Sequence, residues 1–573
     1  MTTNRLVFLI AACLLLLLPL LPACGGGDDE DSTPIQSPTQ TATPMTTPTT
    51  MTPAPETTIP AAPAKPEGTL TMALQTIAVR PWIGPFSQGE NTEKPYWAPI
   101  YDYLVFDAGT DDYIPGLAES WEVVPDGMSI TFKLREGVQF HDAWGEMTSE
   151  DVKFTIDTLL NPALSECSNC QTNINPVFDR VETNGPYEVT VYSSRARAED
   201  FLGYMCPSHA HGIGISSKAY YEAVGYEEAN KHLIGTGPYK FVKFEIGSAL
   251  EMEAVDDHWR VVPEFEKLII REVLELTTRV AMMQTGEADI ADVSPEQAAF
   301  LEGKGFTVVT VPGSKFYSAS LLGQWLPDVE TYDPDVPWLD ERVRKAANLA
   351  INREEISQTI FEGYAAPTPM NFHSPWIQDL DPYPYDPDQA RQLLAEAGYP
   401  DGFDTEIWNL QWSGSVGLTD LLFAVQGYWQ DVGINASINP YNVMAVYGDI
   451  VRRNTSGKVM SFIQSQSYAP YGQGPTIWGN SEMATFPMYE SEEFDALIEE
   501  YFGAFTREER DAAGEKMVNH LYNEYAVVPL VEMDAIWAKG DRVGEWTPTN
   551  WNYIDLEYIT HSPPIGTFRL FDF

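Results

Sequence analysis

Residues 116–157, GLAESWEVVPDGMSITFKLREGVQFHDAWGEMTSEDVKFTID, decide the fold class of this chain. Two β-rich runs, residues 121–124 and 129–134, flank a Pro-Asp-Gly turn, which predicts a β-hairpin. The segment from Thr148 to Asp151 then predicts the start of a helix, because its first hydroxyl and last carboxylate can accept hydrogen bonds from free backbone N–H groups. The stretch therefore predicts strand, turn, strand and helix, in that order.

Four further segments keep an order that matches a known family. They read GTGPY (235–239) with LEMEAVDDHWR (250–260), RVAMMQTGEADIAD (279–292), DERVRKAANLAINREEISQTIFEG (340–363) and DPDQARQLLAEAGYPDGF (386–403). Together with the opening stretch they resemble the family 5 extracytoplasmic solute-binding proteins, the oligopeptide- and dipeptide-binding type, over residues 68–540. The resemblance implies a protein that captures a solute for an ABC importer and is not an enzyme.

The resemblance also implies a domain organisation. The fold would be α/β, of the type II periplasmic-binding-protein kind, with two lobes, a hinge and an extra subdomain. Two segments, residues 311–317 and 525–533, would cross between the lobes as short extended stretches that can absorb a hinge rotation. Lobe I would comprise residues 68–97, 232–311 and 527–573, the extra subdomain residues 98–231, and lobe II residues 312–526.

Local signals within the predicted lobe II agree with an α/β pattern. Strands are predicted at residues 403–410, 434–439 and 459–463, and they alternate with amphipathic helices. Capping residues predict where those helices start, and Gly398 predicts where one of them ends. The predicted helix starts are Asn352, Asp386, Ser491 and Thr506.

The composition is strongly acidic, with 83 Asp and Glu against 34 Lys and Arg and a formal charge of −49. Such a surface repels nucleic acid and anionic lipid, so we expect no nucleic-acid partner. The charge fits a solubilising surface, including one adapted to salt, and it also fits attraction of cationic ligands. We expect a monomer.

The first 23 residues resemble a lipoprotein signal peptide. Arg5 is the only charge, and the apolar run at residues 6–21 contains Pro19 and is shorter than the roughly 20 residues of a membrane span. The sequence LPACG at residues 21–25 resembles a lipobox, in which Cys24 would carry diacylglycerol. Residues 24–67 are rich in Thr and Pro and predict a disordered tether. We therefore expect an extracytoplasmic protein, on the periplasmic or cell-surface side, anchored to the cell membrane by this lipid alone.

Three cysteines remain in the predicted body. Cys167 and Cys170, with Cys206, His209 and His211, could form a zinc site. Their spacing is not a standard zinc pattern, so one disulfide with a spare thiol is the favoured interpretation, although its connectivity cannot be read from the sequence. We expect no metal and no cofactor.

Two polar turns at strand ends are candidate ligand contacts. Trp412 and Ser413 follow the strand at residues 403–410, and in the family this turn faces the cleft. Gln464, Gln466 and Tyr468 lie where peptide binders of the family commonly carry a Trp and an acid that pairs with the ligand's amino group. Residues 462–480 contain no acid, which favours a neutral, amide- or hydroxyl-bearing solute. An ordinary polar loop is the alternative for the second turn.

Aromatic residues near the predicted crossings are further candidates. They are Tyr96, Trp97, Tyr317 and Trp325. Such side chains can stack on a solute in the cleft, or they can pack the interface between the lobes.

The sequence contains no His-Glu-x-x-His, Gly-x-Ser-x-Gly or Walker motif. A solute-binding lipoprotein that delivers a peptide-like or oligosaccharide ligand to ABC permease subunits is the function that the resemblance implies. Nickel and haem are minor ligand possibilities. The alternatives are a secreted α/β hydrolase and a surface receptor that uses the same fold without transport.

Overall fold

A computed structural model describes most of the chain between residues 65 and 562. The described residues are 65–77, 83–86, 94–107, 113–125, 127–167, 174, 178–194, 200–209, 212–372, 374–411, 416–465, 488–504, 506–548 and 553–562. The predicted signal peptide, Cys24 and nearly all of the predicted tether lie outside these ranges.

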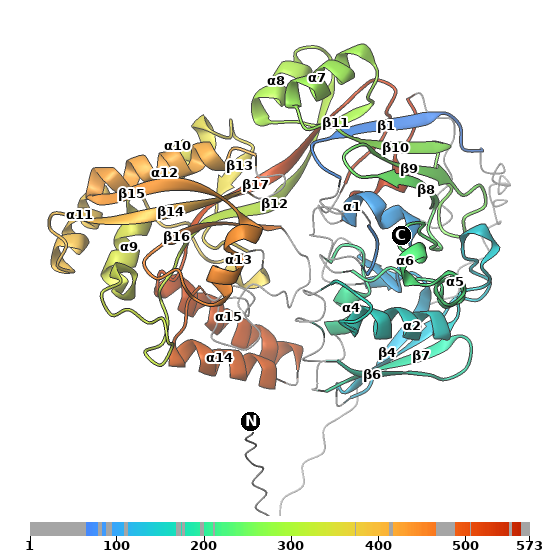
Figure 1. The fold of residues 1–573 in the computed structure, drawn as a ribbon, viewed down its shortest axis with the longest axis horizontal. Coiled ribbons are helices and arrows are strands. Elements are labelled where there is room, and N and C mark those ends of the chain that lie inside the picture. The colour runs from blue at the N-terminus through green and yellow to red at the C-terminus, as the bar shows by residue number, and fades with distance from the viewer. Residues whose placement is uncertain are drawn as a thin grey trace, which may run out of the picture. The chain divides into compact units, whose positions relative to one another are not determined.

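A mixed sheet of eleven strands forms the centre of the fold (Figure 1). Ten strands follow the order β15-β14-β16-β12-β17-β11-β1-β10-β9-β8, and β13 pairs with β17. In that order the ten strands span Ile434–Asn442, Phe403–Gln411, Val459–Ser465, Thr307–Leu321, Val528–Lys539, Ile290–Asp292, Thr69–Leu74, Lys267–Glu272, Ala249–Ala254 and Tyr239–Glu245, and β13 spans Ala365–Pro367.

Two long antiparallel strands, β12 and β17, run through both halves of this sheet. At one end, residues 307–311 of β12 pair with β17 next to β11 and β1, and we call this side the β1 half. At the other end, residues 315–321 of β12 pair with β16, which neighbours β14, and we call this side the β14 half. The two halves are thus connected by continuous strands and not by loops.

The two segments predicted as extended crossings, residues 311–317 and 525–533, belong to longer strands than predicted. Both predicted segments lie largely inside long strands, of 15 residues for β12 and 12 for β17, which pair with each other. The pairing register shifts between Val311 and Lys315, where Gly313 has a φ of 58°. A register break of this kind bends a strand locally. The bend therefore lies at the point where the β1 half meets the β14 half.

Replacement of Gly313 with alanine is expected to lower the free energy of unfolding by about 1–2 kcal/mol, because a left-handed backbone is strained for a residue with a Cβ. Thermal and urea unfolding would measure the loss. Gly427→Ala is the matched control, since Gly427 is an exposed residue inside helix α12 (Leu418–Val432) and alanine there should stabilise by about 0.5–1 kcal/mol. Equal effects of the two substitutions would contradict a strained role for Gly313.

Helices cover both faces of the β14 half. Successive residues of β14 point to opposite faces: Ile407 packs in the same hydrophobic cluster as Trp429 of α12, and Trp408 packs with Phe494 of α14. The helices following the crossing strand β12 are α9 (Glu341–Leu349), α10 (Arg353–Thr359), α11 (Pro387–Glu396), α12 (Leu418–Val432), α13 (Val443–Val451), α14 (Glu492–Gly503) and α15 (Arg507–Asn523).

The predicted helix starts are confirmed. The side chains of Asn352, Asp386, Ser491 and Thr506 each accept a hydrogen bond from a backbone N–H three residues on. Helix α11 ends just before Gly398, as predicted. These caps satisfy N–H groups that the first helical turn leaves without partners.

The opening stretch of the sequence forms part of a separate four-stranded sheet with the order β4-β5-β7-β6. Strand β5 (Ser129–Leu134) lies where it was predicted, and β4 (Ala118–Val123) begins three residues earlier. Thr148 and Asp151 form the predicted capping box of α2 (Ser149–Leu160). The other strands are β6 (Phe178–Thr183) and β7 (Glu188–Ser193), and a small pair is formed by β2 (Val105–Asp107) and β3 (Tyr113–Pro115).

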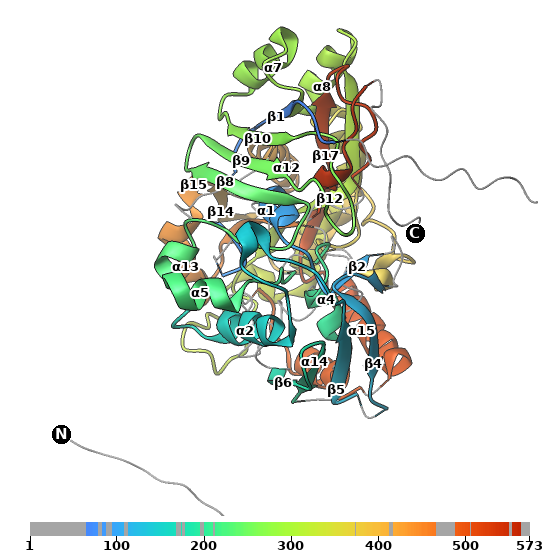
Figure 2. The ribbon, with the colours of Figure 1, turned by 90° about the vertical axis from the view of Figure 1, so that its right-hand side faces the viewer.

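Short helices connect this subdomain sheet with the β1 half (Figure 2). They are α1 (Lys94–Trp97), α4 (Phe201–Tyr204), α5 (Lys218–Val224) and α6 (Tyr226–Ala229), and α7 (Leu276–Thr285) and α8 (Pro295–Glu302) belong to the β1 half. The exact boundaries of the two lobes and the subdomain stay a prediction. Within the described ranges, no helix combines the length and the apolar character that a membrane crossing needs.

Candidate functional site

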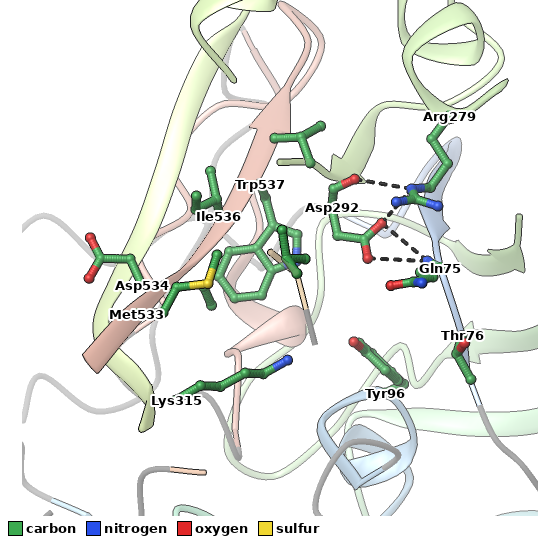
Figure 3. A pocket seen from close by; sticks show the side chains of 13 residues that line it. Gln75, Thr76, Tyr96, Arg279, Asp292, Lys315, Met533, Asp534, Ile536 and Trp537 are labelled. Atoms are coloured by element: carbon green, nitrogen blue, oxygen red, sulfur yellow. Dashed lines mark hydrogen bonds and ion pairs between the residues drawn. The ribbon is translucent and has the colours of Figure 1, made fainter. Parts of the chain in front are cut away.

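A small pocket lies where the two halves of the large sheet meet (Figure 3). Its volume is about 60 Å³, which corresponds to about two water molecules at the roughly 30 Å³ that each occupies in the liquid. Both halves contribute to its wall, through the ends of β1 and β11 and through the central parts of β12 and β17. The lining residues are Gln75, Thr76, Tyr96, Arg279, Asp292, Val293, Lys315, Val416, Met533, Asp534, Ala535, Ile536 and Trp537.

An ion pair between Arg279 and Asp292 forms one wall of the pocket. Arg279 lies in α7 and Asp292 ends β11, and their Nε and Oδ1 atoms are 2.7 Å apart. The backbone N–H of Gln75 donates to both carboxylate oxygens, at 3.1 and 3.2 Å. Burial raises the pKa of Asp292, and the positive charge of Arg279 opposes that shift. Because several bonds hold both groups, this wall is pre-organised.

Lys315 places an ammonium group in the same pocket. Its side chain is buried, and burial lowers its pKa to about 8, while the charge of Asp292 acts in the opposite direction. Figure 3 shows the Lys315 ammonium and the Tyr96 hydroxyl pointing toward each other beneath Trp537. Burial raises the pKa of Tyr96, so its hydroxyl stays protonated at neutral pH. The pocket thus offers a cationic donor and a neutral hydroxyl beside an aromatic ring.

The described residues that line the pocket include hydrogen-bond donors, acceptors and aromatic rings, which can hold a solute by hydrogen bonds and stacking. In the part of the chain that the structure describes, no three His, Cys, Asp or Glu side chains are grouped so as to hold a metal ion. A solute group with acceptor oxygens or negative charge would match the Lys315 donor.

Two hydrogen bonds connect the pocket with the strand crossing. The Asp534 carboxylate accepts from the backbone N–H of Gly313 at 3.1 Å, and burial raises the pKa of Asp534. Figure 3 shows this carboxylate pointing away from Lys315. The Tyr317 hydroxyl donates to the carbonyl of Val416 at 3.0 Å, which attaches the segment before α12 to β12.

Of the four predicted aromatic contacts, only Tyr96 is among the lining residues of this pocket. Trp97 is buried in the core of the β1 half, with its ring 5.7 Å from that of Tyr101. Tyr317 is fully buried in the β14 half, and Trp325 is buried there in another cluster. The last three side chains pack in hydrophobic cores, and their contact with a solute stays a prediction.

Gln464 and Tyr317 do not share a surface, because β12 and β16 place them on opposite faces of the sheet. Gln464 pairs with Phe316, the neighbour of Tyr317 along β12, and paired residues point to the same face. Their side chains therefore point to opposite faces of the sheet, and a contact of either one with a solute stays a prediction. Trp412, Ser413, Gln466 and Tyr468 lie outside the described residues, and their place in the site stays a prediction.

Among the described cysteines, Cys167 is disulfide-bonded and Cys206 is a free, buried thiol. Cys206 is therefore the spare cysteine of the predicted arrangement and is not part of its disulfide. Burial raises the pKa of this thiol to about 12. Cys170 and His211 lie outside the described residues.

Sequence reasoning missed the pocket's charged residues, Arg279, Asp292, Lys315 and Asp534. A signal was present for two of them, since Lys315 interrupts the run VTVPGSKFYSASLL and Asp292 ends the strand sequence IAD. A charge within a buried strand needs a partner or a function. That Arg279 pairs with Asp292 required the fold.

Comparison with known proteins places the chain in a family. A family model described as bacterial extracellular solute-binding proteins, family 5 Middle, matches residues 112–483. Heme-binding protein A of Haemophilus influenzae is 25% identical over 501 residues, covering 79% of this chain and 85% of that relative. The glutathione-binding protein GsiB of Pectobacterium atrosepticum is 32% identical over 301 residues, 51% of this chain and about half (54%) of that relative's length.

A solved structure shares the fold. The periplasmic binding protein DppA from Helicobacter pylori, in complex with the peptide STSA, superposes with a TM-score of 0.72 at 22% identity, covering 87% of this chain and 98% of the other. The predicted α/β fold of the type II periplasmic-binding-protein kind is thereby confirmed. With the sheet crossing, the pocket between its halves and the match over residues 112–483, the chain belongs to the bacterial extracellular solute-binding proteins of family 5.

Proposed function

We propose that this protein is the solute-binding component of an ABC importer. It captures a peptide-like or oligosaccharide solute between two lobes, closes about the β12–β17 crossing and delivers the solute to permease subunits. The observation that carries the proposal is the pocket at the register break, because both halves of the sheet supply its walls. A solute that contacts both halves favours the closed arrangement by its differential affinity for it.

Peptide-like solutes are the first choice. Glutathione is a small peptide-like molecule and is named for one relative, and the H. pylori structure holds a peptide. The 60 Å³ pocket is too small for a whole peptide, so we propose that it receives only an end group of the solute. The absence of acids from residues 462–480 still favours a solute without an obligatory free amine at that loop.

We further propose that Cys24 carries the lipid anchor, that residues 24–67 serve as a tether and that the protein works as a monomer outside the cytoplasm. The binding proteins among its relatives support a role without turnover. Family membership supports the extracytoplasmic location.

The test is identification of the bound solute. Native mass spectrometry of the gently purified protein should release a small molecule, and thermal-shift panels of peptides and oligosaccharides should raise the melting temperature for that class alone. Chemical conversion of the solute by the purified protein, or no stabilisation by any member of either panel, would overturn the proposal.

The Trp412 turn supplies a second check on the site. We expect Trp412→Ala to weaken solute binding without changing the melting temperature of the solute-free protein, because an aromatic face lost from a cleft costs contact area and not core packing. Isothermal titration would measure the affinity. Unchanged affinity would remove Trp412 from the site.

A further inference from the structure

An ion pair joins two parts of the chain that the sequence separates by 310 residues. Arg510 lies in α15, and its Nη1 atom is 2.7 Å from the Oδ1 atom of Asp200, which directly precedes α4. Helix α15 packs in the core of the β14 half through Met517 and Leu521, whereas Phe201 of α4 packs in the core of the subdomain sheet. The pair therefore connects two different hydrophobic cores.

Both charges are shielded from water. The Arg510 side chain is 2% exposed and the Asp200 side chain 10% exposed. Burial of a charge is costly, and the contact between these two side chains offsets part of that cost for each of them. Separation of the two parts would instead return both side chains to water, where an ion pair contributes little. The contact is thus strong only in the arrangement that brings α4 and α15 together.

The pair also lies far along the fold from the bend at Gly313. Figures 1 and 2 both show α4 and α15 on the side of the molecule opposite α7 and α8, away from the end of the β12–β17 crossing that joins the β1 half. A rotation about the bend moves distant atoms more than near ones. Even a modest opening there would break a contact that depends on a separation of 2.7 Å.

We propose that Asp200 and Arg510 form a latch that holds the subdomain and the β14 half together in the closed form. This inference rests on the proposed function, in which the halves open to admit a solute. By stabilising the closed form the latch raises the apparent affinity for any solute that binds it, since apparent affinity scales with the fraction of binding-competent protein. Asp200 and Arg510 are not among the residues that line the pocket, so the effect of the latch is expected to be the same for different solutes.

The first experiment measures opening without any solute. Nitroxide labels at Asp157→Cys in α2 and Glu499→Cys in α14, both exposed positions, would report the distance between the two parts by pulsed electron resonance. Arg510→Gln and the milder Asp200→Asn should each shift the solute-free population toward longer distances. Because no solute is added, this readout is independent of the transported molecule, so failure of the latch and failure of the proposed function can be told apart.

Two further variants make the test decisive. The charge-reversed pair Asp200→Arg with Arg510→Asp should restore the short distance that each single reversal loses. Lys516→Gln is the matched control on the same helix, since Lys516 pairs with Glu500 at the surface and should leave the distances unchanged. With glutathione as the probe, or the solute that co-purifies, the latch variants should bind about tenfold more weakly. Unaltered distances in folded Arg510→Gln and Asp200→Asn, or no rescue by the reversed pair, would overturn the latch.

Discussion

Replacement of Asp102 with asparagine is expected to lower the free energy of unfolding by about 3–5 kcal/mol, the cost of removing one partner from a buried ion pair. Asp102 is fully buried, and its carboxylate accepts from the Nε2 atom of His258 at 3.1 Å and from the Nε1 atom of Trp259 at 2.7 Å. The guanidinium of Arg260 adds a bond at 3.1 Å. In Asp102→Asn the amide NH₂ group would replace one acceptor oxygen with a donor, although the surrounding groups of His258, Trp259 and Arg260 are themselves donors.

The loss would extend beyond one residue, because Arg260 continues the network. Its Nη1 atom lies 3.1 Å from Glu557 and 2.8 Å from the hydroxyl of Tyr558. Asp102 precedes the subdomain sheet, Arg260 follows β9 and Glu557 lies near the C-terminal end of the described chain. The network thus ties three segments that are distant in sequence, and the Arg260 guanidinium joins them because it binds both Asp102 and Glu557.

Urea denaturation of the wild type and of Asp102→Asn at neutral pH would measure the difference. Asp179→Asn is the matched control, since Asp179 also pairs with an arginine, Arg180, but at an exposed site where ion pairs contribute little. The control should unfold at the wild-type urea concentration. A loss for Asp102→Asn no larger than that of the control would contradict the role of the network.

The lowered pKa of Asp102 predicts that the protein loses stability at acidic pH. Burial alone would raise the pKa of Asp102, but His258 and Arg260 outweigh it and lower the pKa from 3.8 to about 2. The group therefore contributes stability above its unfolded pKa of about 4, and this contribution is lost as the pH falls toward 2. The stability difference between the wild type and Asp102→Asn should shrink over that interval.

The sequence predicted the structural elements whose formation depends on residues close to one another in the chain. The hairpin and capping box at residues 116–157 required only local turn and capping chemistry, and both are present. The sequence predicted the two crossing segments but not that they are parts of long paired strands. That pairing, and the break in its register between Val311 and Lys315, depends on partners on β17 that lie more than 200 residues away.

The site was harder to predict for the same reason. Tyr317 lies inside β12 and Gln464 near the end of β16, and only the pairing of Gln464 with Phe316 shows that their side chains face opposite sides of the sheet. Arg279 and Asp292 were both within a quoted motif, yet their ion pair depends on how α7 packs against β11. Residue type alone identified candidate site residues, but the long-range pairing and packing of strands and helices determines which of these residues lie together.

Replacement of Lys315 with methionine is expected to weaken solute binding by about 10- to 100-fold, the value of a hydrogen bond to a charged group. The reason is position: the Lys315 ammonium is buried at the bend of β12 and points into the pocket that both sheet halves form. Methionine keeps most of the side-chain length and removes the charge. Isothermal titration with the co-purified solute would measure the change. Lys458→Met is the control, because Lys458 pairs with Glu406 on the β14 half, outside the pocket lining, and should leave the affinity unchanged.

The same substitution has a second expected result that needs no solute. Burial lowers the pKa of Lys315 from 10.5 to about 8, so between these values the unfolded chain binds more protons at this residue than the folded protein does. Stability conferred by this group must then rise as the pH increases from 8 to 10.5. Lys315→Met should lack that rise and should be at least as stable as the wild type at pH 7, since it no longer buries an ammonium. Parallel stability profiles of the two proteins from pH 7 to 10.5 would show that Lys315 is not buried in solution. If the pH–stability profiles of the two proteins differ as expected but the solute affinity is unchanged, Lys315 is buried in solution but takes no part in solute recognition.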